Sequence, residues 1–436
     1  NNMGGGLMQL VAYGAQDIYL TGNPQITFFK VVYRRHTNFS MESIKQTFNG
    51  NVAFGGDVSA TISRNGDLVH RMYLEFNPQE LLPTGGSPFT THELACAANL
   101  GNALIKECEL EIGGQRIDKH YGHWLTTWSE LTESNSSGSM GIVGGNDGSG
   151  SDGDNSGKEP DTLSTLYQRM TYNHKGEDLH YASYHNQHAP DKAFLPLQFW
   201  FCRNPGLALP LIALQYHEVK VKITFPNSIE LREPESTEAG QGASYSGLSS
   251  VDLFVDYIYL DTDERRRFAQ VSHEYLIEQL QFQNFSSDNT TLDLNFNHPV
   301  KELIFTGTPS LVVPVEGGST GVVTGPSTPS ALGTGKYQLK LNGHDRFAER
   351  DVRYFTRTQV WQHHTGYGGT TVPDSIGVYS FALKPEEHQP SGTCNFSRID
   401  NAQLKVETNN AGINLYAVNY NVLRIMSGMG GLAYSN

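Results

Sequence analysis

Cysteine is scarce in this chain of 436 residues, which contains only Cys96, Cys108, Cys202 and Cys394. No two of them are spaced as a CxxC motif, so neither a zinc knuckle nor a redox motif is indicated. Four cysteines are also too few for the disulfide framework of a small secreted domain. We therefore expect reduced, mostly buried thiols in a protein made in the cytoplasm.

Charged residues are scarce as well: they make up 17% of the chain, and the net charge is −14. Phosphate contacts need clustered Lys and Arg, so this balance argues against a nucleic-acid-binding protein. The one tight basic run, Arg265 to Arg267, is flanked by Asp261, Asp263 and Glu264, and we expect it to be paired locally within a linker.

Long apolar runs are absent. The longest, Ala193–Phe201 and Leu207–Leu214, are interrupted by proline and fall short of the roughly 18 residues that a spanning helix needs. The first residues lack the basic and apolar regions of a signal peptide, and Met8 occupies the position where myristoylation needs Ser or Thr. We expect a soluble protein.

Motifs for catalysis are missing or out of context. The chain has no Walker A loop, no HExxH and no dinucleotide fingerprint after a strand. Gly317–Gly321 matches G-x-S-x-G, but it lies in a Gly/Thr/Pro loop and not at a strand-to-helix turn. Asp152–Gly157 copies only the first half of an EF-hand loop, because Pro160 and Leu163 stand at its ninth and twelfth positions.

Histidines occur in two groups, which are His174, His180, His185 and His188 near Glu177 and Asp178, and the pair His363–His364. A zinc site needs three or four ligands that converge on one point, and spacing alone does not provide this. Histidines at the surface or the edge of the core are the favoured interpretation. We predict no catalytic residue, no metal and no cofactor, and therefore no enzyme.

The chain does contain the same strand-like segments twice, in the same order. The matching pairs are Leu110–Ile117 with Leu339–Phe347, Val219–Lys222 with Leu404–Glu407, and Val255–Leu260 with Val418–Leu423. Internal repetition of this length predicts two copies of one β-rich domain side by side.

Alternation and turn chemistry support this prediction. Phe39–Phe48 alternates with period two and predicts a strand that buries one face. Asn65–Gly66, Gly113–Gly114 and Asn342–Gly343 are typical of hairpin turns with two positive φ angles. Many short strands between such turns indicate an all-β fold of sandwiches or jelly rolls.

The predicted organisation is an N-terminal arm (1–26), a first β domain (27–262), a linker (263–273) and a second β domain (274–436). Residues 134–160 are almost wholly Ser, Gly, Asn and Asp, which predicts a long surface loop, and 309–335 form a second one. Candidate modification sites are the five N-x-S/T sequons at Asn38, Asn135, Asn284, Asn289 and Asn395. Each accepts a glycan only where it is exposed and meets a glycosylation machinery.

Several long motifs resemble one known family. They are Tyr13–Lys30, Ile62–Leu68, Leu110–Tyr121 and Pro205–Val219 in the first half, and Phe296–Pro299, Leu341–Phe347, Gln389–Asn401 and Asn419–Tyr434 in the second. Over nearly its whole length the chain is similar to major capsid proteins of nucleocytoplasmic large DNA viruses, of the type that infects algae.

The resemblance implies a double jelly roll, with two eight-stranded antiparallel sandwiches in each subunit. It further implies homotrimers that form pseudo-hexagonal capsomers and tile an icosahedral shell around an inner membrane. The arm would lie at the base near minor capsid proteins, and the long loops would face outward. Expected partners are the homotrimer, neighbouring capsomers, and minor capsid and penton proteins, with no membrane span and no direct nucleic-acid contact. Synthesis and assembly would take place in the host cytoplasm, late in infection.

Two other classes stay open on the residues alone. A carbohydrate-binding jelly roll would bind glycans independently of the sequons. A cupin-type enzyme would hold a stoichiometric transition metal inside one barrel. Trimers in solution would favour the capsid hypothesis over both.

Overall fold

The computed structural model describes residues 10, 12, 14–81, 99–133, 165–173, 191–231, 247–309, 327–369, 372–409 and 412–434. The predicted loop 134–160 lies outside these residues, as does the part of the second loop from 310 to 326. The chain divides into two units, Asn1–Asn38 and Phe39–Asn436, which are described separately. Within its described residues, the first unit contains one short helix, α2 (Ile18–Thr21), and no buried side chain.

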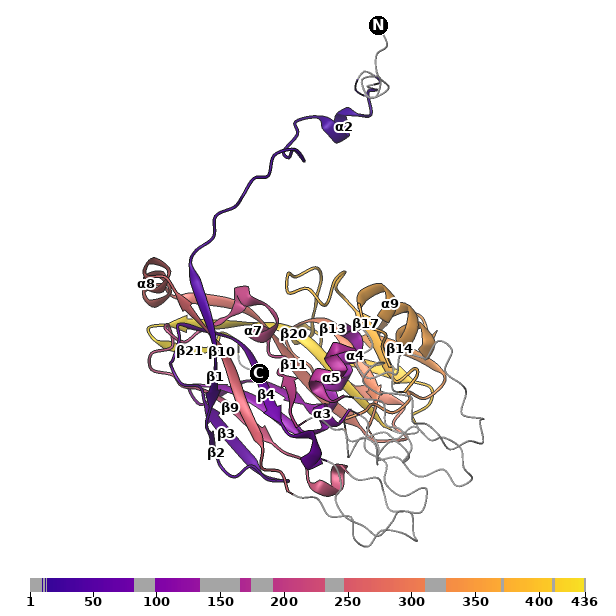
Figure 1. Ribbon diagram of the computed structural model, residues 1–436. Helices are drawn as coiled ribbons and strands as arrows, with labels where there is room; N and C mark the ends of the chain where they lie inside the picture. Colours follow the sequence, from indigo (N-terminus) through magenta and orange to yellow (C-terminus); the bar gives the residue numbers. More distant parts are fainter. Residues whose placement is uncertain are drawn as a thin grey trace, which may run out of the picture. The chain divides into compact units, whose positions relative to one another are not determined.

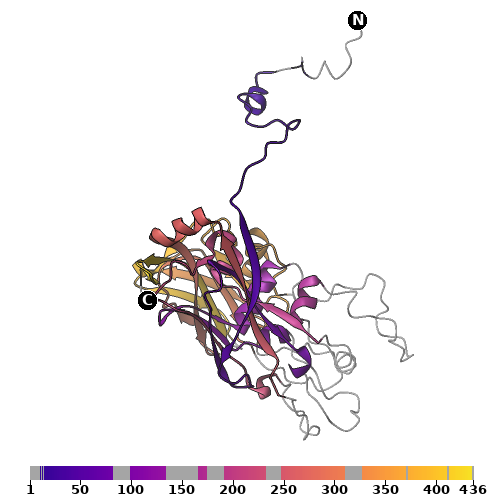
Figure 2. The ribbon, with the colours of Figure 1, turned by 60° about the vertical axis from the view of Figure 1, so that its left-hand side comes forward.

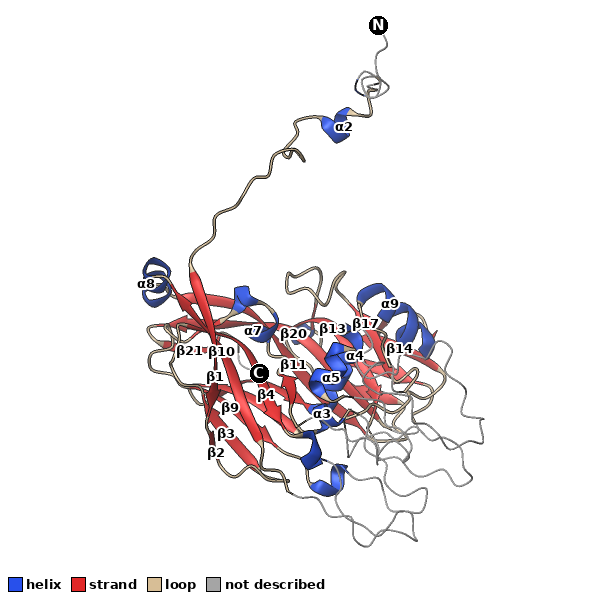
Figure 3. Ribbon diagram, in the orientation of Figure 1, coloured by secondary structure: helices blue, strands red, loops and turns tan. Residues whose placement is uncertain are grey.

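The second unit is built mainly of strands (Figure 3). Its first sandwich pairs a sheet of order β1-β10-β4-β7 with a sheet of order β2-β3-β9-β5-β6. The strands are β1 (Phe39–Gln46), β2 (Phe48–Asn49), β3 (Asp57–Thr61), β4 (Leu68–Phe76), β5 (Glu107–Ile112), β6 (Gln115–Tyr121), β7 (Ala193–Pro196), β8 (Leu209–Pro210, paired with β4), β9 (Val219–Thr224) and β10 (Val251–Leu260).

The second sandwich has sheets of order β11-β20-β13-β17 and β12-β19-β14-β15. Short strands β18 and β21 extend the first of these sheets, and β16 extends the second. The strands are β11 (His273–Phe285), β12 (Thr291–Asp293), β13 (Pro299–Gly307), β14 (Lys336–Leu341), β15 (His344–Asp345), β16 (Arg350–Asp351), β17 (Ile376–Ser380), β18 (Cys394–Asn395), β19 (Ala402–Val406), β20 (Ile413–Met426) and β21 (Met429–Leu432).

The two sandwiches repeat one strand order. Taken from the edge, β1-β10-β4-β7 corresponds to β11-β20-β13-β17, and β3-β9-β5-β6 corresponds to β12-β19-β14-β15. The repeated sequence segments occupy equivalent places, namely β5–β6 and β14–β15, β9 and β19, and β10 and β20. The predicted double jelly roll is therefore confirmed, with eight strands in each described sandwich apart from the short additions.

Two of the three predicted turns have the expected geometry. Gly113 and Gly114 have φ of 58° and 84°, and Asn342 and Gly343 have φ of 50° and 77°. The prediction for Asn65–Gly66 is wrong, because β3 and β4 belong to different sheets and do not pair as a hairpin. Gly66 is instead required by space, since a Cβ there would lie 2.8 Å from the Cβ of Tyr257.

Strand β1 also differs from its prediction. It is an edge strand, and only Ile44 and Gln46 are even partly withdrawn from solvent, so the expected buried face is present only at its end. Edge strands pair on one side only, and alternation in the sequence does not report whether a second sheet covers the whole strand.

Short helices fill the connections. They are η1 (Pro78–Leu81), α3 (Leu100–Ala103), α4 (Gly122–Thr132), α5 (Leu166–Thr171), α7 (Trp200–Arg203), η3 (Pro205–Leu207), η4 (Ser228–Leu231), α8 (Thr262–Gln270), the π-helix η5 (Tyr354–Gln359), α9 (Val360–His363) and η6 (Phe396–Arg398). The expected linker 263–273 thus consists largely of α8, which follows β10 at the end of the sheet where β1 begins (Figures 1 and 2). None of the helices in the described part of the chain is long and apolar enough to cross a bilayer.

One core joins the two sandwiches. The larger cluster of buried apolar residues contains the interior of the first sandwich together with Ile277, Ile304, Tyr416 and Val418 of the second. A separate cluster fills the second sandwich and contains the alternate residues of the same strands, such as Leu303 and Leu415. The β11-β20-β13-β17 sheet is therefore covered on both faces, which explains why the first nine residues of β20 are all buried.

Candidate functional site

The interface between the two sandwiches contains the most unusual polar chemistry in the described part of the chain. Helix α4 lies between the sandwiches, and nine of its eleven residues are buried (Figure 1). Its Trp124 ring lies 5.2 Å from the ring of Tyr416 on β20. Its last carbonyls, those of Glu130 and Leu131, accept hydrogen bonds from the backbone N–H groups of Gly368 and Gly366 in the second sandwich. Two carbonyl groups at the C-terminal end of a helix in the first sandwich thus find their hydrogen-bond donors in the second sandwich.

The first group of charges centres on Glu278 of β11. Arg203 at the end of α7 donates to one of its carboxylate oxygens at 2.6 Å, while the Lys301 ammonium and the His388 ring lie 2.8 Å and 3.3 Å from the other. The Lys301 side chain is fully buried. Burial alone would raise the pKa of Glu278, but the Arg203 and Lys301 cations and the His388 hydrogen bond outweigh it and hold this pKa well below its usual range.

The second group centres on His364, which follows α9. Its ring nitrogens lie 3.0 Å from Glu302 of β13 and 3.1 Å from Glu386, and the side chains of His364 and Glu302 are fully buried. Burial alone would lower the pKa of His364, but the two carboxylates raise it from 6.5 to about 9. The ring is therefore an imidazolium at neutral pH and donates from both nitrogens.

Trp128 of α4 connects the two groups. The Arg203 guanidinium lies over its ring at 4.9 Å, and the His364 ring approaches it edge-on at 6.5 Å. We call Arg203, Glu278, Lys301, Glu302, His364 and Glu386 the interface cluster. It places three basic side chains beside three carboxylates, and burial lowers the pKa of Lys301 while the neighbouring Glu278 partly offsets this.

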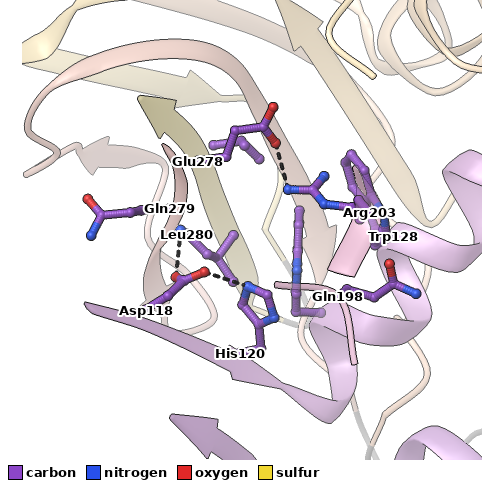
Figure 4. A pocket seen from close by; sticks show the side chains of 10 residues that line it. Asp118, His120, Trp128, Gln198, Arg203, Glu278, Gln279 and Leu280 are labelled. Atoms are coloured by element: carbon purple, nitrogen blue, oxygen red, sulfur yellow. Dashed lines mark hydrogen bonds and ion pairs between the residues drawn. The ribbon is translucent and has the colours of Figure 1, made fainter. Parts of the chain in front are cut away.

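A small cavity adjoins the interface cluster. Figure 4 shows Arg203 beside Trp128 with Glu278 facing the guanidinium, and Asp118 and His120 on the neighbouring strand. Asp118 accepts the Leu280 N–H at 3.1 Å and contacts His120 at 3.0 Å. The cavity measures about 10 Å³, which is room for one water molecule and not for a substrate. This geometry supports a structural role and offers no place for catalysis.

A wider groove of about 390 Å³ crosses strands β3, β9 and β5. Three of its four charged side chains are in ion pairs, since Lys222 contacts Glu111 and the Lys119 ammonium lies 2.7 Å from Glu107 and 3.3 Å from Glu109. The fourth, Asp57, accepts a hydrogen bond from the Thr224 hydroxyl at 2.6 Å. Charge ladders of this kind stabilise neighbouring strands and do not indicate a ligand.

The four sequon asparagines in the described residues all have exposed side chains. They differ in whether the side-chain nitrogen, which would carry the glycan, donates hydrogen bonds within the protein. Asn284 donates to Asn414 at 2.6 Å and to Thr308 at 3.1 Å, and Asn289 donates to Ser286 at 3.1 Å. Asn395 uses its oxygen to accept the Ser397 N–H at 3.1 Å. Asn38 is exposed in the first unit, and Asn135 lies outside the described residues. Glycosylation at these five positions stays a prediction.

The other motifs provide no competing site. His363 contacts the Leu383 carbonyl at 3.3 Å, while His364 turns to Glu302 and Glu386, so the two histidines do not converge. Among the described residues no group of three or more His, Cys, Asp and Glu could hold a metal. The other four histidines, Gly317–Gly321 and Asp152–Gly157 lie outside them. The expectation of local pairing for the basic run is confirmed for Arg267, which lies 3.5 Å from Glu264. It is wrong for Arg265, which binds the distant, buried Asp67 through two hydrogen bonds of 2.9 Å and 3.0 Å.

The cysteines that are described, Cys108, Cys202 and Cys394, are all free thiols. Cys108 and Cys202 are buried, and burial raises the pKa of Cys202 to about 12. Cys96 lies outside the described residues.

Sequence comparison places the whole chain in one family. Residues 27–261 match the family model of the major capsid protein N-terminus, and residues 264–431 match that of the large eukaryotic DNA virus major capsid protein. The major capsid protein of Pyramimonas orientalis virus is 50% identical over 465 aligned residues, and that of Paramecium bursaria Chlorella virus 1 is 43% identical over 488. In both cases all of this chain and all of the relative are covered.

Solved structures agree with this assignment. A chain of the PBCV-1 virus capsid quasi-atomic model superposes with a TM-score of 0.69 at 37% identity, and the match covers 94% of this chain and 100% of that one. The Faustovirus major capsid protein superposes with a TM-score of 0.60 at 12% identity, over 95% and 94% of the two chains, and shows the shared fold alone. The chain therefore belongs to the major capsid proteins of large eukaryotic DNA viruses, a family of structural virion proteins and not of enzymes.

Proposed function

We propose that this capsid protein forms homotrimers, that each trimer is a pseudo-hexagonal capsomer, and that capsomers tile an icosahedral shell around an inner membrane. The observation that carries the proposal is the repeated strand order of the two sandwiches. Three subunits with two similar sandwiches each present six similar blocks around a three-fold axis, so that neighbours can pack in a near-hexagonal lattice.

The interface cluster supports this role by holding the two sandwiches in one orientation. A tile must present its two blocks at a fixed angle, because lateral contacts around it are repeated many times and each is weak alone. Buried ion pairs contribute little net stability, but they make one arrangement much better than those that leave a charge unpaired.

The proposed domain boundaries are 1–26 for the arm, 27–262 and 274–436 for the sandwiches, and 263–273 for the linker. The two hydrogen bonds that Arg265 of α8 donates to the buried Asp67 would hold the linker against the first sandwich. Further proposed partners are neighbouring capsomers and minor capsid and penton proteins. Assembly would take place in the host cytoplasm.

Light scattering coupled to size-exclusion chromatography tests the proposal directly. The purified full-length chain should elute with three times the mass of one subunit, and electron micrographs at high protein concentration should show hexagonally packed particles. A chain that stays monomeric at all concentrations and salt conditions would overturn the proposal.

A further inference from the structure

The first unit contains an apolar segment, Ile26 to Tyr33, that the other described residues of this unit leave exposed. Six of its eight residues are large and apolar, and their side chains are 69–98% exposed. Residues 24–38 form no helix or strand, and Figure 1 shows them as an open trace. Soluble proteins rarely expose so much contiguous apolar surface, and such runs mark contact sites.

The charge around this segment is opposite to that of the rest of the protein. Residues 1–38 contain Lys30, Arg34 and Arg35 against one acidic residue, Asp17, which gives a net charge of +2. The total of −14 therefore leaves −16 for residues 39–436. A basic, apolar segment joined to an acidic body is complementary to that body in another copy of the same chain.

The backbone of the segment favours a protein surface over a lipid surface. A segment that lies in a membrane interface is typically an amphipathic helix, which satisfies its own backbone groups. In a helix Thr27, Lys30 and Arg34 would share one polar face, but residues 24–38 form no helix. Backbone N–H and C=O groups without regular structure find partners in a protein surface and not in lipid.

We propose that the segment Ile26–Tyr33, with the basic residues Arg34 and Arg35 that follow it, docks on the acidic body of a second copy of this chain. The inference rests on the proposed capsid assembly and names the surface that joins one subunit to the next. Docking buries the apolar side chains, while the arginines face carboxylates of the neighbour.

Photo-cross-linking tests the proposal with the full-length chain. Phe29, which is 98% exposed, is replaced by p-benzoylphenylalanine, and isotopically heavy and light chains are mixed before illumination. Cross-links between heavy and light chains are expected. Cross-links found only within single chains would overturn the inference.

Charge reversal provides the second measurement. Arg34→Glu with Arg35→Glu should weaken self-association in sedimentation velocity by about tenfold, which corresponds to about 1.4 kcal/mol. The matched control is Arg266→Glu with Arg267→Glu, which makes the same charge change on exposed residues of α8 and should stay within about twofold of the unchanged protein. Equal effects of both variants, or an effect confined to binding of phosphatidylserine vesicles, would refute docking on a second copy.

The two proposals fail in different ways. If the unchanged protein forms trimers but position 29 cross-links only within its own chain, the docking inference alone is wrong. If light scattering finds only monomers, the proposed assembly fails, and the docking inference fails with it.

Discussion

His364 should make the stability of this protein fall between pH 7 and pH 10. Its pKa is about 9 in the folded chain and 6.5 when it is unperturbed. A group whose pKa is raised by folding contributes its full stability below the unfolded pKa and loses it as the pH rises through the folded pKa. About three quarters of the contribution is therefore present at pH 7, and almost none of it at pH 10.

The size of the effect follows from the same two values. The difference between 6.5 and about 9 corresponds to about 3 kcal/mol, most of which is lost between pH 7 and pH 10. Because the side chain is fully buried, solvent screening does not reduce this figure appreciably. A loss of about 2 to 3 kcal/mol is roughly a 30- to 150-fold change in the folding equilibrium.

The variant His364→Gln isolates this contribution from other groups that titrate in alkali. It is neutral at every pH and leaves Glu302 buried without its cation, so it should be less stable than the unchanged protein at pH 7 by at least 2 kcal/mol. Its stability should approach that of the unchanged protein as the pH rises to 10. Urea unfolding followed by tryptophan fluorescence at equal protein concentrations measures both curves, and unfolding rates replace equilibrium values if refolding is incomplete.

His363→Gln is the matched control, because His363 is only half-buried and contacts a backbone carbonyl. Its curve should lie within about 0.5 kcal/mol of that of the unchanged protein. If the curves of His364→Gln and the unchanged protein stay parallel from pH 7 to pH 10, His364 is not charged in the folded state, and the account of the interface cluster is wrong.

Four further outcomes are expected. Gly122→Ala should lower the stability of the protein in thermal unfolding by about 1–3 kcal/mol, because the added Cβ would lie 2.2 Å from the Ile105 carbonyl oxygen. The control Gly114→Asn should change the stability by less than about 0.5 kcal/mol, because that site is open and Asn tolerates positive φ. Mass spectrometry of proteolytic peptides from virion-derived protein should find any N-linked glycan at Asn395 before Asn284, whose amide nitrogen donates two hydrogen bonds. A glycan on Asn284 alone would contradict this. Cys108 and Cys202 should react with a thiol reagent only after unfolding, and fast labelling of either in the native protein would show that the first core is open. Asn419→Asp in β20 should lower the free energy of unfolding in urea at pH 7 by about 3 kcal/mol or more, because the new carboxylate would be fully buried. Asp256→Asn at the half-buried equivalent position in β10 should lower it by less than about 1 kcal/mol. Equal losses would mean that the two strands have similar environments.

The strands and their duplication could be predicted from the sequence because their signals are local. Alternation along β5, β9 and β10 and the glycine turns at 113–114 and 342–343 repeat wherever the backbone geometry repeats. Helix α4 gave no such signal. It is buried on nearly all sides, so its apolar residues do not recur on one face, and its stability comes from the two sandwiches that enclose it.

The sequence drew attention to His364 but not to the interface cluster, because its members are spread from Arg203 to Glu386 and meet only in the folded chain. One signal was present in β13, Pro299–Gly307, where Lys301 and Glu302 stand side by side in a mostly apolar strand. Charges in such a strand are almost never left unpaired when buried, so partners of opposite charge from elsewhere in the chain could have been expected.

Duplication placed equivalent strands in different surroundings, and their residues differ accordingly. In β10 the residues alternate between buried and half-buried, because the second sandwich does not cover its outer face. In β20 both faces are covered, and the position equivalent to the half-buried Asp256 is Asn419, which is fully buried. The Asn419 oxygen accepts a hydrogen bond from Gln281 at 2.9 Å, and Asn421 donates to Gln279 at 2.9 Å. Amides can satisfy one another across β11 and β20 without a counter-ion, whereas a carboxylate there would need one. The second sandwich thus differs from the first where the two meet, and this asymmetry, together with the interface cluster, makes two similar domains into one block with a fixed orientation.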